Sequence, residues 1–479
     1  MKKILKKYES LSVPVKASLW YTVCSIVNKG MALLSTPIFT RVMSEEQYGQ
    51  FSIFQSWVSI LIIFTSLNIF LSGYQRGLIL FEDDVDSFTS SQLGLIITIT
   101  SGFCVVYLIA PSFWSNFFEL SPVLMLAMFA ELFFMPATEL WSEKQRFDYK
   151  YKKYVVLTIV MTAFSLGGGI IAVNSTSYKT EARIYTDMMA KSLAGLSLLV
   201  LLFCRGKKFY NKKYWNYALG FNIPLIPHYL SNYVLNQSDR LMIGRMIGKA
   251  QTAYYSVAYT ISSVMMLVMT AINNSLTPYI YKSIAAKKTS NIKKIANGLV
   301  VLIACLCICV MAFAPEVIYI FAGEKYTDAI YVIPPIALSV LFIFEYSLFS
   351  TIEYYYEKTK WISTATCICA ALNLVLNFVF IRMYGYYAAG YTTLVCYVFL
   401  AYIHYLFYKK VLKEQSEDAI YDIKLIFVVS IVALILMLIL VLLYGNIYIR
   451  YSIILVILAV VVKYKNMIMN LLFVFKNKG

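Results

Sequence analysis

Lysine and arginine residues are distributed unevenly along this 479-residue chain, and no other feature constrains its fold as strongly. Long apolar stretches divide the chain, and the gaps between them are alternately rich and poor in basic residues. Of the 42 Lys and Arg residues, 31 lie in or at the edge of one set of alternate gaps and 9 in the other set. Short loops rich in Lys and Arg stay on the cytoplasmic side of a membrane. The pattern therefore predicts an even number of membrane spans with both termini in the cytoplasm.

The apolar stretches have the length of membrane spans, since a helix needs about 20 residues to cross the hydrocarbon layer. No gap between them exceeds 20 residues, which leaves no room for a soluble domain. We expect an all-α polytopic membrane protein with about 14 transmembrane helices, at residues 17–38, 48–73, 91–111, 122–141, 153–173, 184–204, 217–237, 252–276, 297–315, 330–352, 361–381, 387–408, 425–444 and 447–462.

Composition supports the same class. Hydrophobic residues make up 60% of the chain, more than the half or so that is usual for soluble domains. The net charge of +17 does not indicate nucleic-acid binding, because the cations lie in loops where they orient the spans and meet anionic lipid headgroups. Membrane lipids, and no nucleic acid, are the expected partners of these loops.

A weak internal repeat suggests how the spans are grouped. The segment from Arg41 to Ile53, between the first two spans, aligns with the segment from Arg245 to Val257, between the seventh and eighth. Six spans separate the two segments, so the halves share one orientation, as in transporters built from parallel repeats. The predicted domains are an N-terminal lobe at 1–210, a C-terminal lobe at 211–412 and a helix pair at 413–479.

Cations within the spans are candidate binding groups, because a charge at bilayer depth costs at least about 2.5 kcal/mol and usually faces a partner or a water-filled cavity. Lys29 lies about 18 Å along the first span from its cytoplasmic start, on a stripe of Ser and Thr side chains. A lumen-facing role is favoured for Lys29 over snorkelling or structural pairing. The candidate substrate-binding cations are Lys29, Arg41, Lys191, Arg240 and Arg245.

Carboxylates at similar depth have two interpretations. Each either neutralises a nearby cation or binds and releases protons during transport. Glu131 could simply neutralise Lys29. The candidates for proton coupling are Glu131, Asp239 and Glu345, whereas Glu139, Asp187 and Glu353 lie near predicted helix ends, where we expect them to be solvated.

No pattern indicates a catalytic centre, a metal site or a cofactor. Cys305, Cys307 and Cys309 fan out around a helix, so they cannot surround a metal ion. Neither of the two histidines, His228 and His404, has the neighbours of a catalytic triad. We expect no metal and no cofactor, and a protein that is not an enzyme.

Three segments resemble a known family. They are Thr36–Gly49, Ser238–Gly244 with the following Tyr255–Tyr259, and the basic segment Gln145–Tyr154. Together with the span count they resemble the Wzx-type flippases of O-antigen and other polysaccharides, which belong to the multidrug/oligosaccharidyl-lipid/polysaccharide exporter superfamily. Of the candidate residues, only Arg41, Asp239 and Arg240 lie in matching motifs.

The resemblance implies two six-helix lobes around a cationic lumen in the bacterial inner membrane. It also implies alternating access that carries an undecaprenyl-diphosphate-linked oligosaccharide, an O-antigen or capsule repeat unit, to the periplasmic leaflet, and other polysaccharide assembly proteins as partners. Three alternatives stay open: a lipid II flippase, a drug antiporter of the same superfamily and, more distantly, a membrane polysaccharide polymerase or ligase.

Overall fold

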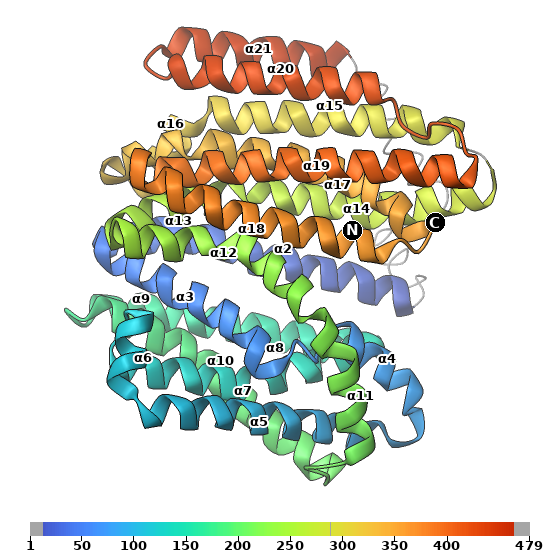
Figure 1. Cartoon of the computed structure of the whole chain (residues 1–479). Helices are drawn as coiled ribbons and strands as arrows, with labels where there is room; N and C mark the ends of the chain where they lie inside the picture. Colours follow the sequence, from blue (N-terminus) through green and yellow to red (C-terminus); the bar gives the residue numbers. More distant parts are fainter. Residues whose placement is uncertain (1–12, 288, 464–479) are drawn as a thin grey trace, which may run out of the picture. The chain divides into compact units, whose positions relative to one another are not determined.

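The computed structural model describes residues 13–287 and 289–463, and these ranges contain helices and no β-strand (Figure 1). Contacts divide the chain into two compact units, Met1–Tyr233 and Val234–Gly479. The all-α polytopic fold predicted from the apolar stretches is confirmed. The finer division at residues 210 and 412 stays a prediction.

The first unit is built from helices that begin with the first predicted span. They are α2 (Val13–Val42), α3 (Glu45–Ser66), α4 (Ser72–Leu80), the 3-10 turn η1 (Glu82–Asp84), α5 (Val85–Ile109), α6 (Pro111–Phe118), α7 (Pro122–Phe147), α8 (Tyr151–Ala163), the π-helical turn η2 (Phe164–Gly168), α9 (Gly169–Asn174), α10 (Lys179–Gly206) and α11 (Lys212–Asn222).

The turn η3 (Ile223–Leu225) and α12 (Ile226–Met246) lead into the second unit. That unit continues with α13 (Lys249–Ser262), α14 (Val264–Ala285), α15 (Ser290–Ala312), α16 (Ala314–Ala322), η4 (Glu324–Tyr331), α17 (Ile333–Tyr355), α18 (Thr359–Tyr384), α19 (Tyr387–Gln415), α20 (Ile423–Leu442) and α21 (Ile447–Lys463).

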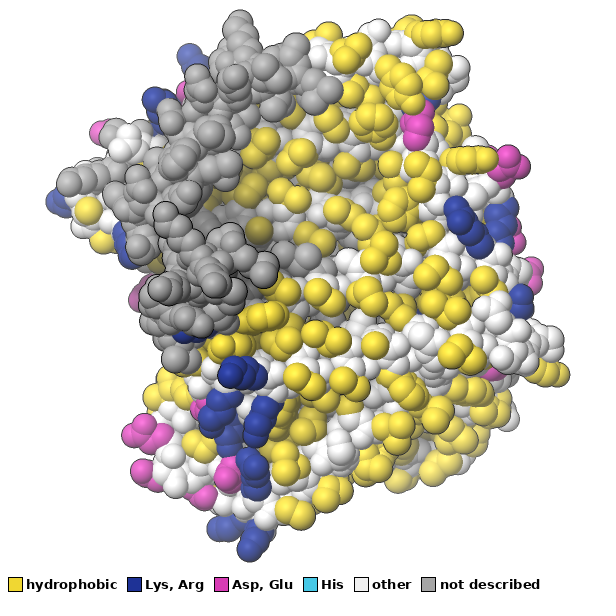
Figure 2. Space-filling view, turned by 180° about the vertical axis from the view of Figure 1, so that it is seen from behind, with side chains coloured by type: hydrophobic (Ala, Val, Ile, Leu, Met, Phe, Trp, Pro, Cys, Tyr) yellow, Lys and Arg dark blue, Asp and Glu magenta, His cyan; other side chains and the backbone are white. Residues whose placement is uncertain are grey.

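Each predicted span overlaps a helix. Within the described ranges, eleven helical stretches are long and apolar enough to cross a membrane, counting η1 with α5, α8 with η2 and α9, and α13 with α14. Three further predicted spans coincide with α2, α12 and α21. α12 is too polar to qualify because Asn236, Gln237, Asp239 and Arg240 lie along it, and α21 has only 17 residues. Figure 2 shows broad hydrophobic areas on one face, with charged side chains toward its sides.

The seventh predicted span is broken where two prolines interrupt it. α11 ends at Asn222, a 3-10 turn follows over Ile223–Leu225, and α12 continues the chain. Pro224 and Pro227 lie in and just after this turn. Proline removes a backbone hydrogen bond and bends a helix, so the two prolines account for the break.

Two helices of the first unit approach each other unusually closely. A Cβ atom added to Gly195 of α10 would lie 2.3 Å from the carbonyl oxygen of Phe134 in α7, so only glycine fits there. Small residues allow such close packing of membrane helices, where van der Waals contact drives association. One turn earlier on each helix lie Glu131 and Lys191, which this packing brings together.

Candidate functional site

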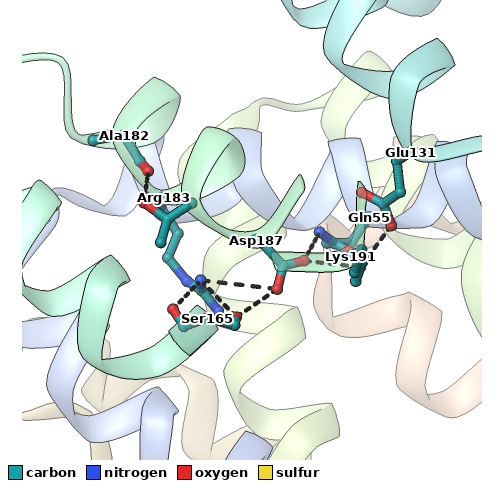
Figure 3. A network of polar contacts seen from close by, with 8 residues as sticks. Gln55, Glu131, Ser165, Ala182, Arg183, Asp187 and Lys191 are labelled. Carbon is teal, nitrogen blue, oxygen red and sulfur yellow. Dashed lines mark hydrogen bonds and ion pairs between the residues drawn. The ribbon is translucent and has the colours of Figure 1, made fainter. Parts of the chain in front are cut away.

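A charged face of α10 forms the centre of the candidate site (Figure 3). Arg183, Asp187 and Lys191 follow one another at intervals of four residues, so they lie on one side of the helix. Arg183 and Asp187 are buried, with 6% and 9% of their surface exposed. The side chain of Lys191 retains 26% exposure.

Lys191 bridges two carboxylates from different helices. Its Nζ atom lies 2.6 Å from Oε1 of Glu131 in α7 and 2.8 Å from Oδ2 of Asp187. Gln55 of α3 donates a hydrogen bond of 3.1 Å from Nε2 to the same Asp187 oxygen. Charge-assisted hydrogen bonds of this kind are about twice as strong as neutral ones. Three helices of the first unit thus meet at the pair of Lys191 and Asp187.

Arg183 is held by the π-helical turn and by two aromatic rings. Its Nη1 atom donates to the carbonyl oxygen of Ser165 at 3.1 Å, while the Ser165 hydroxyl donates to Oδ1 of Asp187 at 2.6 Å. The guanidinium carbon lies 4.5 Å from the ring centre of Phe39 and 5.1 Å from that of Phe51, both within cation–π range. π-helical turns frequently occur at functional sites.

The glycine run beside this turn makes room for the arginine. A Cβ atom on Gly169 would lie 3.1 Å from Nη1 of Arg183 and 3.2 Å from the ring of Phe39. A side chain at this position would press on the guanidinium, so Gly169 helps to fix the position of Arg183.

The four ionisable groups balance in charge when each has its usual state: Arg183 and Lys191 are cationic, and Glu131 and Asp187 are anionic. This charge balance depends on the ionisation of Glu131, whose Oε2 atom is buried and has no hydrogen-bond partner among the described residues. Adding one proton to Glu131 gives the network a net positive charge while Lys191 stays paired with Asp187. Protonation of Glu131 would therefore raise the affinity of the network for an anion.

The second unit holds a different network, centred on the buried carboxylate of Asp239 in α12. Tyr255 of α13 and Thr393 of α19 donate to Oδ2, the latter at 3.0 Å, and Asn377 of α18 donates to Oδ1 at 2.5 Å. All three donors are neutral. Asn373 extends the network by accepting a hydrogen bond from Nδ2 of Asn377 at 3.1 Å.

The remaining candidate cations lie in varied surroundings. Arg240 donates to Oε1 of Gln237 at 2.6 Å, and its guanidinium carbon lies 4.3 Å from the ring centre of Tyr259. Arg41 and Arg245 are exposed, each in the last turn of its helix. The side chain of Lys29 lies outside the described part of the structure, so the pairing with Glu131 that we considered for it rests on the sequence alone. The cation that the structure places on Glu131 is Lys191.

Two other carboxylates are buried in α17. Glu345 accepts a 2.5 Å hydrogen bond from Ser430 of α20, and Glu353 lies 2.8 Å from Nδ1 of His404 in α19. Glu353 and Asp187 were expected to be solvated, and that expectation is wrong. The predicted spans are too short: α10 and α17 extend past them, and neighbouring helices cover both carboxylates.

Arg183 was not among the predicted site residues, because it lies in the gap just before the predicted span 184–204. The intervals of four residues linking Arg183, Asp187 and Lys191 were a usable signal, since they put opposite charges on one helix face. No cluster of three or more His, Cys, Asp or Glu side chains suited to a metal ion is present in the described ranges.

The fold is that of a polytopic all-α membrane protein with charged groups buried among its helices. Residues 15–284 match the family of polysaccharide biosynthesis proteins, and residues 224–379 match the MatE family. The first match covers more than half of the chain, so the chain belongs to the polysaccharide biosynthesis protein family. The assignment to the polysaccharide flippases of the exporter superfamily is thereby confirmed.

Relatives and solved structures agree with this family. The chain is 22% identical over 387 residues to "Lsg locus putative protein 1" of Haemophilus influenzae, a match covering 78% of this chain and 93% of the relative. Its fold is similar to that of the lipid II flippase MurJ in an inward closed conformation, with a TM-score of 0.73 at 14% identity over 94% of this chain and 99% of MurJ. An inward-facing multidrug transporter of the MATE family gives a TM-score of 0.66 at 12% identity, over 84% and 100% of the two chains.

Proposed function

We propose that this protein carries an undecaprenyl-diphosphate-linked oligosaccharide, such as an O-antigen or capsule repeat unit, from the cytoplasmic to the periplasmic leaflet of the inner membrane by alternating access. The observation that carries the proposal is that the segment matching the polysaccharide biosynthesis family also contains the buried network of Arg183, Asp187, Lys191 and Glu131. A diphosphate crossing hydrocarbon needs cations at depth, since an unpaired charge there is costly.

In this proposal, Lys191 is the ammonium group that changes partner. It already makes two charge-assisted contacts with carboxylates and retains some exposure, so a phosphate oxygen can replace one of them without leaving the lysine unpaired. Arg183 strengthens the positive potential but is held by Ser165 and two rings. Lys29, Arg41, Arg240 and Arg245 are further proposed contacts for the diphosphate along its path.

We assign the coupling proton to Glu131. When Glu131 is ionised, it competes with the diphosphate for Lys191; when it is protonated, it releases Lys191 and leaves one uncompensated positive charge for the anion. Proton uptake and substrate binding then favour each other, so a pH difference across the membrane gives the site different affinities for the lipid on its two sides. Asp239 and Glu345 are the alternative coupling sites, but the contacts found for them are hydrogen bonds from neutral donors.

A surface-polysaccharide assay tests the function in cells. In a strain lacking its own flippase, expression of this chain with its cognate glycosyltransferases should restore surface polysaccharide. Lys191→Met should abolish it while the protein remains in the membrane, and Lys287→Met, an exposed lysine, is the matched control. Normal polysaccharide with Lys191→Met would contradict the assigned role of the network.

A lipid II flippase is the second candidate, and the specific observation in its favour is the similarity of the fold to MurJ. Competition separates the two functions. If lipid II displaces a lipid-linked oligosaccharide from the purified protein at equal concentration, the carrier alone is recognised and cell-wall synthesis becomes the better assignment. Stimulated efflux of a cationic dye would instead favour a drug antiporter.

A further inference from the structure

A groove lies along α8. Lys153, Val156 and Val160 follow one face of the helix at the spacing of successive turns, and Trp141 of α7 and Leu198 of α10 form the floor. The groove has a volume of about 490 Å³. Val156 and Val160 expose 62% and 60% of their surface, and the span containing α8 is the least buried of the eleven candidate spans in the described ranges. We call it the α8 groove.

Charge and polarity change abruptly along the α8 groove. Lys152 and Lys153 lie in the first turn of α8, and no ion-pair partner for either is found in the described part of the chain. Beyond them the lining is apolar, and Val160 lies about 10 Å further along the helix axis. A groove of this form matches an anionic headgroup at the lysines with an acyl chain running into the hydrocarbon layer.

Lys152 and Lys153 also interact unfavourably with the dipole of α8. The N-terminal end of a helix has a partial positive charge, which cations in the first turn destabilise and a nearby anion stabilises. The first turn of α8 contains no acidic residue, and Lys150, at the N-cap, makes no side-chain cap. Lys150 is neutralised by Asp148 at 2.7 Å, whereas Lys152 and Lys153 retain their charge for a ligand.

A second, polar cavity of about 790 Å³ adjoins the α8 groove and shares Trp141 and Lys153 with it. Its lining mixes cations with carboxylates, and Lys144 pairs with Asp86 there. Asp83, Asp84 and Arg205 contribute to the same wall. The carboxylates offer acceptors for hydroxyl donors, so this cavity suits the polyol part of a headgroup better than a second phosphate.

We propose that the α8 groove is a binding site for an anionic glycerophospholipid with a hydroxylated headgroup. Its phosphate contacts Lys152 and Lys153, one acyl chain lies over Val156 and Val160, and the headgroup hydroxyls reach the adjoining polar cavity. This site is separate from substrate translocation in the proposed function. By the distribution of Lys and Arg, it faces the cytoplasmic leaflet. Figure 2 shows one face of the molecule, on which Lys and Arg side chains gather beside exposed hydrophobic side chains.

Native mass spectrometry of the delipidated full-length protein tests the site, with phosphatidylglycerol and phosphatidylcholine of matched acyl chains as probes. The parent should retain phosphatidylglycerol in preference to phosphatidylcholine. Lys152→Gln with Lys153→Gln should weaken retention about thirtyfold, since each basic residue near a lipid surface contributes about 1 kcal/mol. Val160→Trp, which fills the groove without changing charge, should also weaken it.

The control is Lys293→Gln with Lys294→Gln, an adjacent pair of exposed lysines near the start of α15, of which Lys293 lies 3.9 Å from Asp422. This variant should retain phosphatidylglycerol as the parent does. Equal losses from the two double variants, no effect of Val160→Trp, or equal retention of the two lipids by the parent would each overturn the site. Tighter retention of a polyprenyl diphosphate, lost with Lys152 and Lys153, would assign the groove to substrate instead. Because the measurement needs no transport, its outcome is independent of the proposed function.

Discussion

The two buried networks of this protein stabilise their buried carboxylates in different ways. In the first unit, the carboxylates of Glu131 and Asp187 are neutralised by cations, whereas in the second unit the carboxylate of Asp239 is surrounded by neutral hydrogen-bond donors. A charge-balanced network changes its net charge when one proton or one anion arrives. A carboxylate held by neutral donors offers no cation for an anion to capture. Burial of a carboxylate therefore does not by itself make a coupling site; the charge of its partners decides whether protonation changes the affinity for an anion.

The largest effect is expected from removing the shared cation. Lys191→Met leaves Glu131 buried without its partner, and breaking a buried ion pair from one side costs about 3–5 kcal/mol. We expect a correspondingly lower unfolding free energy in detergent. Glu131→Gln in the same chain should recover part of the loss, because it removes the uncompensated charge. If the double variant is less stable than Lys191→Met alone, Glu131 is not the group that Lys191 neutralises.

The second network should respond more weakly to loss of charge. Asp239→Asn keeps an acceptor for Tyr255 or Thr393 but turns a second donor toward one of its neighbours, and one unsatisfied buried hydrogen bond costs about 1–3 kcal/mol. Thermal unfolding should therefore show a smaller shift than that of Lys191→Met. A larger shift would mean that the charge of Asp239, and not its hydrogen bonding, holds α12 in place.

The spacing between α7 and α10 can be changed without altering any charge. Gly195→Ala forces the α7 backbone away from α10 near Glu131 and Lys191, and overpacking of this kind costs about 1–3 kcal/mol. We expect lower stability and reduced transport. Gly102→Ala is the matched control, because its added Cβ would meet no atom within 4 Å. Equal behaviour of the two variants would show that close approach of α7 and α10 is unimportant.

The smallest effect is expected from a partly exposed pair outside the two networks. Glu316 of α16 accepts a 2.8 Å contact from Arg450 of α21. Burial alone would raise the pKa of Glu316, but hydrogen bonding to Arg450 holds this pKa below its ordinary value. Its contribution to stability is therefore complete at neutral pH and is lost as the pH falls through the lowered pKa. Glu316→Gln should flatten this acid limb of the unfolding profile; an unchanged limb would assign it to another group.

The fold could be predicted from the sequence because its determinants are local. Apolar length and the placement of Lys and Arg act segment by segment, and Pro224 and Pro227 mark the break before α12. The site depends on pairings between distant segments. Lys191 meets Glu131 sixty residues away because Gly195 packs against Phe134, and Ser430 reaches Glu345 from α20. The sequence identified Glu131 and Lys191 as charges at depth but could not show that they pair.

Transport by the purified protein in liposomes tests the central claim most directly. A fluorescent undecaprenyl-diphosphate-linked oligosaccharide, placed in one leaflet, is followed by loss of signal to a membrane-impermeant quencher, with and without an imposed pH gradient. We expect the parent protein to move the lipid faster with the gradient. Glu131→Gln should still bind the lipid but lose the response to the gradient, and Asp239→Asn should keep it. A parent that ignores the gradient, or a Glu131→Gln variant that responds as the parent does, would contradict the assignment of the coupling proton to Glu131; a parent that moves no lipid at all would contradict the proposed function.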